Sequence, residues 1–264
     1  MLLIIEALLF LAVLRQDHRI AVEETTYPLD MAPDSVDDLY YGCGEKMADL
    51  VEKEYLKKEK ENSEIFREAW IKAENKISRW NILSKLKRTH KIAIRVYTDN
   101  DLYSKFNGDT RTGKQNYKGM TYKWYSLHFL LTEAIQILKK KQNRCFDTFR
   151  GTKSGFNGNV FEDVRFGSFA SSSLDRERAK EFGRVSCFEI HTCEGANVTK
   201  YSTYTYEEEV LIPPYEKFKV TAVKTRTDEP DLWCETVYTL KSSGIRSDLN
   251  CALFNEPTKT ITIP

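Results

Sequence analysis

The sequence has no excess of charge of either sign, because Lys and Arg number 40 and Asp and Glu number 39 in 264 residues. A nucleic-acid backbone is bound by clustered cations, so this balance argues against a nucleic-acid partner. The chain also lacks internal repeats and long low-complexity tracts. Hydrophobic residues make up 41% and charged residues 30%, which is typical of a globular protein. The length suits one core better than two full domains.

The chain has no Cys-x-x-Cys pair, and no histidine lies at zinc-ligand spacing from a cysteine pair, so we expect no metal site. The even number of cysteines instead indicates disulfides formed in a secretory compartment, although spacing alone leaves the pairing open. Asn197 begins the glycosylation sequon Asn-Val-Thr, which fits the same compartment. The six cysteines are Cys43, Cys145, Cys187, Cys193, Cys234 and Cys251.

The first residues form a short apolar run. Residues 2–14, LLIIEALLFLAVL, are apolar except for Glu6, and the run is too short to span a bilayer comfortably. We expect a signal peptide over residues 1–20 and a single domain over residues 21–264. No basic residue precedes the run and no small-x-small site follows it, so a buried N-terminal helix is the alternative. The terminal FNEPTKTITIP carries no hydrophobic tail, which predicts a secreted protein without a stable membrane anchor.

The N-terminal half has mainly helical patterns. Residues 35–88 are rich in Glu, Lys, Leu and Ile and predict two or more amphipathic helices. Residues 91–98, KIAIRVYT, alternate and are β-branched, so they predict a strand, and the polar residues 100–123 predict a loop. Residues 124–140 predict a helix with Leu127, Leu131, Ala134 and Leu138 on one face. His128 lies on this helix, and we interpret it as a packed or half-exposed histidine rather than a catalytic one.

The C-terminal half has strand and turn patterns. From Cys145 onward, short apolar runs alternate with Gly, Asn, Ser and Pro, which is typical of strands and turns. Residues 175–182 predict one short helix, with Asp175 as its N-cap. The pattern as a whole predicts an α+β fold in a single domain, with a helical N-terminal half and a β-rich C-terminal half.

Three segments of the β-rich half carry unusual polar residues. Arg150 follows Phe149 in an apolar strand end, where a cation is costly unless it binds an anion or pairs. Ser171, Ser172 and Ser173 follow a strand-like stretch. Glutamates occupy positions 207–209 directly before Val-Leu-Ile-Pro, and strand alternation places Glu207 and Glu209 on one face and Glu208 on the other. A salt bridge, a turn and an exposed strand end are the purely structural interpretations of these segments.

An arginine, then a serine motif, then Glu-x-Glu resembles the pattern of the arginine-specific mono-ADP-ribosyltransferases, which include vertebrate ecto-enzymes and bacterial toxins. The matching segments are FRGT, RFGSFASSSL and EEEVLIPPYEKF. The similarity extends to DDLYYGC, LYSKFN, LHFLLTEAIQIL and NCALF, and so covers about residues 27–255. The resemblance implies an ADP-ribosyltransferase fold, in which a helical N-terminal part packs on a β-rich NAD-binding core of mixed or antiparallel strands.

The resemblance also implies a role for each site residue. Arg150 and Gly151 correspond to the residues that hold NAD, and Ser171 to the serine that orients the catalytic glutamate. Glu209 corresponds to the catalytic glutamate, and Glu207 to the glutamate that marks arginine as the acceptor. Phe149 departs from the family pattern, where a tyrosine is more usual, but the ring is kept. The expected donor is NAD, or NADP, and the expected acceptors are arginine-bearing proteins or small guanidino compounds.

Physical chemistry supports these roles. Cleavage of the nicotinamide–ribose bond builds positive charge on the ribose, and a carboxylate such as Glu209 stabilises that charge. The acceptor guanidinium is permanently protonated, so a second carboxylate such as Glu207 can bind it and draw off a proton. Tyr204 and Tyr206 could stack on the incoming arginine, or be ordinary strand aromatics. Arg95, in another apolar run, is a weaker candidate for the NAD-binding arginine because no Gly-Thr follows it.

The family pattern implies the disulfides Cys43–Cys251 and Cys145–Cys193. Cys187 and Cys234 are then left over, and they either form a third bridge or remain two free buried thiols. Two other functions stay open at this point. The first is an NAD glycohydrolase that uses water as the acceptor, and the second is a catalytically silent secreted binding protein of the same fold.

Overall fold

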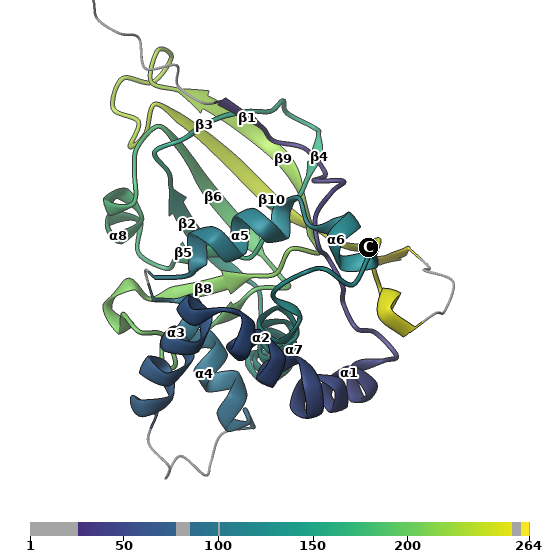
Figure 1. Ribbon diagram of the computed structural model, residues 1–264. Helices are drawn as coiled ribbons and strands as arrows, with labels where there is room; N and C mark the ends of the chain where they lie inside the picture. The colour runs from purple at the N-terminus through teal and green to yellow at the C-terminus, as the bar shows by residue number, and fades with distance from the viewer. Residues whose placement is uncertain (1–25, 78–84, 100, 255–259, 264) are drawn as a thin grey trace, which may run out of the picture.

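The computed structural model describes residues 26–77, 85–99, 101–254 and 260–263 (Figure 1). The expected signal peptide, residues 1–20, lies outside these residues. Helices from the N-terminal half pack beside a large sheet formed by the C-terminal half (Figure 1). Among the residues described, no helix has the length and apolar character needed to cross a membrane.

The helical part is formed by residues 44–142. A π-helical turn, Val51–Tyr55, joins the first two helices, and Ser63 caps the third by accepting a hydrogen bond from the backbone N–H of Phe66 at 3.3 Å. The helices described in this part are α1 (Gly44–Leu50), α2 (Leu56–Asn62), α3 (Glu64–Asn75), α4 (Arg88–Tyr97), α5 (Tyr103–Arg111), α6 (Lys114–Lys118) and α7 (Tyr125–Gln142).

Helix α7 is the central helix of this part, and its apolar face is the predicted one. Leu127, Leu131, Ala134 and Leu138 are all buried. The carboxylate of Glu59 on α2 accepts the backbone N–H of Ser126 at 3.1 and 3.2 Å, which pairs a free donor of the first turn. Three lysines occupy the last turn, where cations complement the helix dipole.

Two predictions for the N-terminal half are wrong. Residues 91–97 of the predicted strand lie in α4, Thr98 is the C-cap of that helix, and the predicted loop over residues 100–123 contains α5 and α6.

Most residues of α4 are buried, and its apolar residues alternate as in a strand. The helical period is carried instead by Arg88, Lys91 and Arg95, which are three and four residues apart on one helix face. Helices α5 and α6 are each held by one large buried aromatic, Phe106 and Tyr117, in an otherwise polar sequence.

The sheet is mixed and nine-stranded within the described residues, in the order β4-β9-β10-β6-β2-β5-β8-β7, with β11 paired to β10. Strands β10 and β6 are parallel, and the other neighbours are antiparallel. A separate parallel pair joins β1 to β3. The strands are β1 (Thr26–Pro28), β2 (Phe146–Gly151), β3 (Gly155–Asn157), β4 (Asp163–Val164), β5 (Ala170–Ser173), β6 (Ser186–Thr192), β7 (Ala196–Asn197), β8 (Glu209–Ile212), β9 (Glu216–Thr225), β10 (Thr236–Ser247) and β11 (Ile261–Ile263).

One short helix, α8 (Arg176–Glu181), interrupts the strands. Asp175 caps it, as the sequence predicted, by accepting the N–H of Glu177 at 2.8 Å. The largest hydrophobic core lies between the helical part and the sheet, where Phe169, Ala196 and Leu211 join the buried faces of the helices. The α+β architecture, with helices packed on a mixed sheet, is therefore confirmed.

The two ends of the described chain are tied together near the start of the helical part. Asp37 forms a buried ion pair with Arg165 and accepts the backbone N–H groups of Asp248 and Leu249.

Three disulfides join Cys43 to Cys251, Cys145 to Cys193, and Cys187 to Cys234. The first two pairs are those that the family resemblance implies, and the third resolves the open alternative in favour of a bridge.

Candidate active site

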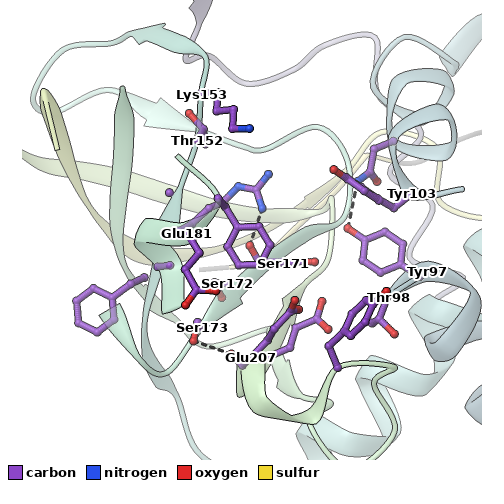
Figure 2. A pocket seen from close by; sticks show the side chains of 18 residues that line it. Tyr97, Thr98, Tyr103, Thr152, Lys153, Ser171, Ser172, Ser173, Glu181 and Glu207 are labelled. Carbon is purple, nitrogen blue, oxygen red and sulfur yellow. Dashed lines mark hydrogen bonds between the residues drawn. The ribbon is translucent and has the colours of Figure 1, made fainter. Parts of the chain in front are cut away.

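The three unusual polar segments meet at one pocket of about 430 Å³. Arg150 comes from the end of β2, Ser171 from β5, and Glu209 from the start of β8. Strand β5 pairs with both β2 and β8, so the order of the strands brings residues that are 59 positions apart in the chain (209 − 150) to one place. Figure 2 shows the pocket with its lining side chains.

Arg150 is held before any ligand binds. Its Nη1 donates a hydrogen bond of 2.6 Å to the backbone carbonyl of Ser171, drawn as a dashed line in Figure 2. Burial lowers the pKa of Arg150, but a guanidinium remains protonated across the physiological range. The pocket therefore contains a fixed cation that can bind an anionic group.

The serine segment holds the glutamate segment in place. The Ser172 hydroxyl donates to the carbonyl of Val210 at 2.9 Å, and the Ser173 hydroxyl donates to the carbonyl of Glu207 at 2.6 Å. Ser171 hydrogen-bonds to the carboxyl group of Glu209. All three serines line the pocket. Through these hydrogen bonds, each serine connects β5 to the segment that carries the glutamates.

Glu209 is almost fully buried, with 3% of its surface exposed. Its Oε2 accepts a hydrogen bond of 3.1 Å from the hydroxyl of Ser202. Burial raises the pKa of Glu209 to about 7, while the hydrogen bonds from Ser171 and Ser202 and the cation of Arg150 act in the opposite direction. The carboxyl group is thus poised between its charged and neutral forms near neutral pH.

Glu207 lines the same pocket, but not for the reason predicted. The sequence placed Glu207 and Glu209 on one face of a strand, whereas Glu207 ends a 3-10 turn and β8 begins only at Glu209. Glu208 between them has φ 49°, in the left-handed region, and is exposed. This backbone reversal, rather than strand alternation, places both outer glutamates at the pocket. Partial burial, and then the charge of Glu181, raise the pKa of Glu207.

Gly151 follows Arg150 where the backbone of β2 passes very close to α8. A Cβ at this position would lie 2.2 Å from the carbonyl oxygen of Ala179 and 2.4 Å from that of Gly183. Only glycine fits so close an approach, so the Arg-Gly sequence is explained by packing. Gly151 also lines the pocket, where the sequence analysis expected it.

The helical part supplies one wall that the sequence analysis missed. Tyr97 ends α4 and Thr98 follows it, and Tyr103 and Asn107 come from α5. Tyr97, Thr98 and Tyr103 are labelled in Figure 2. Asn107 Nδ2 donates to the Tyr97 hydroxyl at 3.1 Å, and that hydroxyl donates to the carbonyl of Phe169 at 3.0 Å. The buried Oδ1 of Asn107 accepts no hydrogen bond from the described residues.

The wall residues were missed because their segment was assigned to a strand and a loop. The one sequence signal for this wall was the segment LYSKFN. It resembles the family, but the resemblance gave its residues no role in the site. Tyr103 and Asn107 are four residues apart, and this is the spacing that places two side chains on one helix face.

The two predicted tyrosines are in different positions. Tyr204 is half-buried and lines the pocket, whereas Tyr206 is 55% exposed and is not among the lining residues. Their ring centroids are 5.9 Å apart. The guanidinium of Arg178, on α8, lies 5.6 Å from the Tyr206 ring centroid.

Arg95 and His128, the two residues set aside by the sequence analysis, lie outside the pocket. Arg95 lies on α4 and donates to the carbonyl of Ser202 at 3.5 Å. His128 is fully buried between the Tyr40 hydroxyl and the Val36 carbonyl, and burial lowers its pKa to about 4. His128 is therefore a packed, neutral histidine, as predicted.

Two further expectations concern modification and metal binding. Asn197 lies in β7 and is half-buried, and its Oδ1 accepts the N–H of Thr199 at 3.0 Å. Among the described residues, Cys145, His191 and Cys193 form a group with metal-ligand spacing. The two sulfurs of that group are joined in a disulfide and so offer no thiolate.

Comparisons with known proteins agree with this geometry. The family model described as NAD:arginine ADP-ribosyltransferase matches residues 29–236. An erythroblast NAD(P)(+)--arginine ADP-ribosyltransferase of Gallus gallus is 36% identical over 240 residues, which is 86% of this chain and 76% of the relative. A GPI-linked NAD(P)(+)--arginine ADP-ribosyltransferase 1 of Mus musculus is 34% identical over 254 residues, or 87% of this chain and 74% of the relative.

Solved structures give the same family. The crystal structure of the eucaryotic mono-ADP-ribosyltransferase ART2.2 superposes with a TM-score of 0.72 at 30% identity, covering 85% of this chain and 98% of that one. A mutant of that protein in complex with NAD superposes with a TM-score of 0.70, at the same identity and coverage. The chain belongs to the NAD:arginine ADP-ribosyltransferase family.

Proposed function

We propose that this chain transfers ADP-ribose from NAD to arginine side chains and releases nicotinamide. The observation that carries the proposal is the convergence of Arg150, Ser171 and Glu209 on one pocket that Glu207 also lines. A cationic group lies toward one end of this pocket and acidic groups toward the other. In Figure 2, Lys153 lies at the top of the view and Glu207 at the bottom.

The cationic end suits the donor phosphates. Arg150 is fixed by its bond to the Ser171 carbonyl, and Lys153 lines the same pocket. A guanidinium and an ammonium together can neutralise a pyrophosphate. Donor binding at this end would direct the nicotinamide ribose toward Glu209, and Tyr103 and Asn107 would form the facing wall.

Glu209 has the chemistry that bond cleavage requires. When the bond between ribose C1′ and the nicotinamide nitrogen breaks, its electron pair leaves with neutral nicotinamide and positive charge develops on the ribose. A carboxylate in a dry, preorganised site stabilises that charge more than it stabilises the ground state. Ser171 and Ser202 hold the Glu209 carboxyl in place, so little reorganisation is needed.

Glu207 supplies the acceptor chemistry. An arginine side chain must lose a proton before one of its nitrogens bonds to ribose C1′. Glu207 is half-buried, and its raised pKa makes it a better proton acceptor than an exposed glutamate. The proton passes to this carboxylate, and the new nitrogen–carbon bond replaces the bond to nicotinamide.

Glu207 also separates transfer from the alternatives. Hydrolysis of NAD by the same site needs Glu209 but no carboxylate for a guanidinium, so the presence of Glu207 favours transfer. A catalytically silent binding protein has no need of a buried Glu209 supported by Ser171 and Ser202 together with a preset Arg150. We therefore place the transferase ahead of both.

NADP is the second candidate donor. It differs from NAD by one phosphate, which needs a further cation. Lys153 is exposed at the cationic end of the pocket and forms no ion pair with any residue that the structure describes. Comparing KM for NADP and NAD in Lys153→Ala tests this point, because loss of the ammonium should weaken NADP more than NAD.

We further propose that the chain is made as a signal peptide, residues 1–20, followed by one catalytic domain, residues 21–264, and that it acts outside the cell. Three disulfides support an oxidising compartment. Glycosylation at Asn197 is part of the same proposal. One relative is named as GPI-linked, so the protein's release into medium should be tested directly by fractionating expressing cells.

The test of the proposed function uses NAD labelled in its adenylate part and a small guanidino compound. We expect a labelled conjugate and an equal amount of free nicotinamide. Nicotinamide release without a conjugate would identify a glycohydrolase, and neither product from folded protein would indicate a silent binding protein.

A further inference from the structure

Arg178 lies in an environment that resembles an arginine-binding site. Its guanidinium carbon is 5.6 Å from the Tyr206 ring centroid, and its Nη1 lies 3.0 Å from Oε1 of Glu181. An aromatic face and a carboxylate are the two groups that a guanidinium binds best. Tyr206 precedes Glu207, whereas Arg178 and Glu181 lie on α8, so the contact joins two separate elements.

This contact lies at the acidic rim of the pocket. Glu181 and Glu207 both line the pocket and are labelled in Figure 2. The charge of Glu181 contributes to the raised pKa of Glu207, so the two carboxylates lie close enough to interact. Tyr204, whose ring neighbours Tyr206, lines the pocket as well.

We propose that Arg178 occupies an acceptor guanidinium site at this rim, and that an incoming arginine enters the site by displacing it. The proposal rests on the proposed function and adds a residue that sets acceptor affinity. Arg178 is then an internal competitor. Its guanidinium occupies Tyr206 and Glu181 until an acceptor arrives, and it thereby lowers the affinity of the site for weak acceptors.

The contact is weak enough to exchange. The side chains of Arg178 and Glu181 are 44% and 57% exposed, and Tyr206 is 55% exposed. Exposed ion pairs and exposed cation–π contacts are individually small, so an acceptor that makes the same two contacts can replace Arg178. Removal of Arg178 leaves Glu181 without this cation and increases the negative charge that faces an acceptor.

An ordinary surface ion pair is the competing explanation. Arg178 and Glu181 are three residues apart on one helix, a spacing at which such pairs are common. The two explanations predict different effects on acceptor binding, because a surface pair leaves the KM for acceptor unchanged when it is removed.

The helix offers a matched control. Arg176 lies two positions before Arg178 on α8 and is exposed. Arg176→Ala removes the same charge from the same helix, and none of the ring contacts among the described residues involves Arg176. Any general effect of charge or helix stability should therefore appear in both variants.

The experiment measures conjugate formation with agmatine, a single-guanidinium acceptor, at saturating NAD. We expect Arg178→Ala to lower the KM for agmatine about threefold to tenfold, with kcat at saturating agmatine little changed. Arg178→Lys should give a smaller decrease, because an ammonium keeps the pair with Glu181 but stacks less well. Arg176→Ala should match the wild type. A KM that is unchanged relative to Arg176→Ala, or increased, would overturn the proposal.

A binding measurement separates this proposal from the proposed function. The Nε–H resonance of Arg178, assigned by its loss in Arg178→Ala, should move when agmatine is titrated without NAD. That shift would support the site even if the wild type formed no conjugate and the transferase proposal failed. If the wild type forms conjugate but the resonance does not move, the transferase stands and the Arg178 site is excluded.

Discussion

Arg150 donates a hydrogen bond of 2.6 Å to the backbone carbonyl of Ser171, so the cation of the pocket is oriented by the strand that carries the serine. The same strand, β5, pairs with β8, and the register places Ser173 opposite Glu209. Cation, serine and carboxylate are therefore positioned by backbone pairing before a substrate enters. Preorganisation of this kind reduces the reorganisation needed when charge develops in the transition state.

The first prediction concerns the Glu209 carboxylate. Glu209→Gln should abolish both transfer to arginine and hydrolysis of NAD, because the amide carries no charge to stabilise the ribose cation. The expected loss is about 3–4 kcal/mol of transition-state stabilisation, measured through kcat/KM for NAD.

A stability measurement controls for misfolding of this variant. The folded pKa of Glu209, about 7, lies above the value for an unfolded glutamate, so its stabilising contribution is present at low pH and is lost as pH rises through about 7. Glu209→Gln should therefore be at least as stable as the wild type at alkaline pH. Full transferase activity in a variant with this stability would show that Glu209 is not the catalytic carboxylate.

The second prediction divides the work between the two glutamates. Glu207→Gln should lose conjugate formation while nicotinamide release from NAD remains measurable, because water needs no carboxylate to bind a guanidinium. Both products are quantified in the same reaction. Glu208→Gln is the matched control, since Glu208 is exposed and is not a lining residue. A parallel fall of the two activities in Glu207→Gln would contradict the division.

The third prediction is a pH profile. Burial raises the pKa of Glu209 to about 7, and only the carboxylate form can stabilise the ribose cation. The kcat/KM for NAD should therefore fall as pH drops below about 7 and level off above it. Ser202→Ala removes a hydrogen bond that lowers this pKa, so it should move the acid limb to higher pH. A flat profile from mildly acidic to mildly alkaline pH is incompatible with the assignment.

The fourth prediction concerns the tyrosines before Glu207. Tyr206→Ala removes the exposed ring that Arg178 covers, so the KM for a guanidino acceptor should rise by about twofold to thirtyfold, the range expected for a guanidinium–aromatic contact. Conjugate formation should fall more than nicotinamide release. Tyr204→Ala should show the same separation if its ring, which lines the pocket, also contacts the acceptor. If neither variant separates the two rates, the tyrosines are structural.

The strand patterns placed the site segments in the β-rich half, but the roles of their residues came from the family resemblance. Arg150, Ser171 and Glu209 each belong to a strand of the β-rich half, and the sheet order brings them together. The position of Glu207 was predicted for the wrong reason. Glu208 has a left-handed backbone conformation, which is uncommon for residues other than glycine. Strand alternation therefore gave no indication of the turn.

The helical wall was not predictable by the same means. Ile92, Ile94 and Val96 alternate like a strand, yet they lie in α4. The helical spacing of Arg88, Lys91 and Arg95 is present in the same segment, but the apolar alternation obscures it. Tyr103 and Asn107 lie in a polar segment with few apolar residues, and tertiary packing of Phe106 fixes that segment as a helix. The wall of the pocket therefore depends on contacts that are distant in the sequence.

The most direct test of the account uses a peptide with one arginine and its arginine-to-lysine counterpart. Each is incubated with the protein and NAD, and fragmentation mass spectrometry locates any ADP-ribose. The account predicts modification of the arginine side chain by the wild type, none of the lysine peptide, and none by Glu209→Gln. Modification of both peptides, or of neither while folded wild-type protein releases nicotinamide, would contradict it.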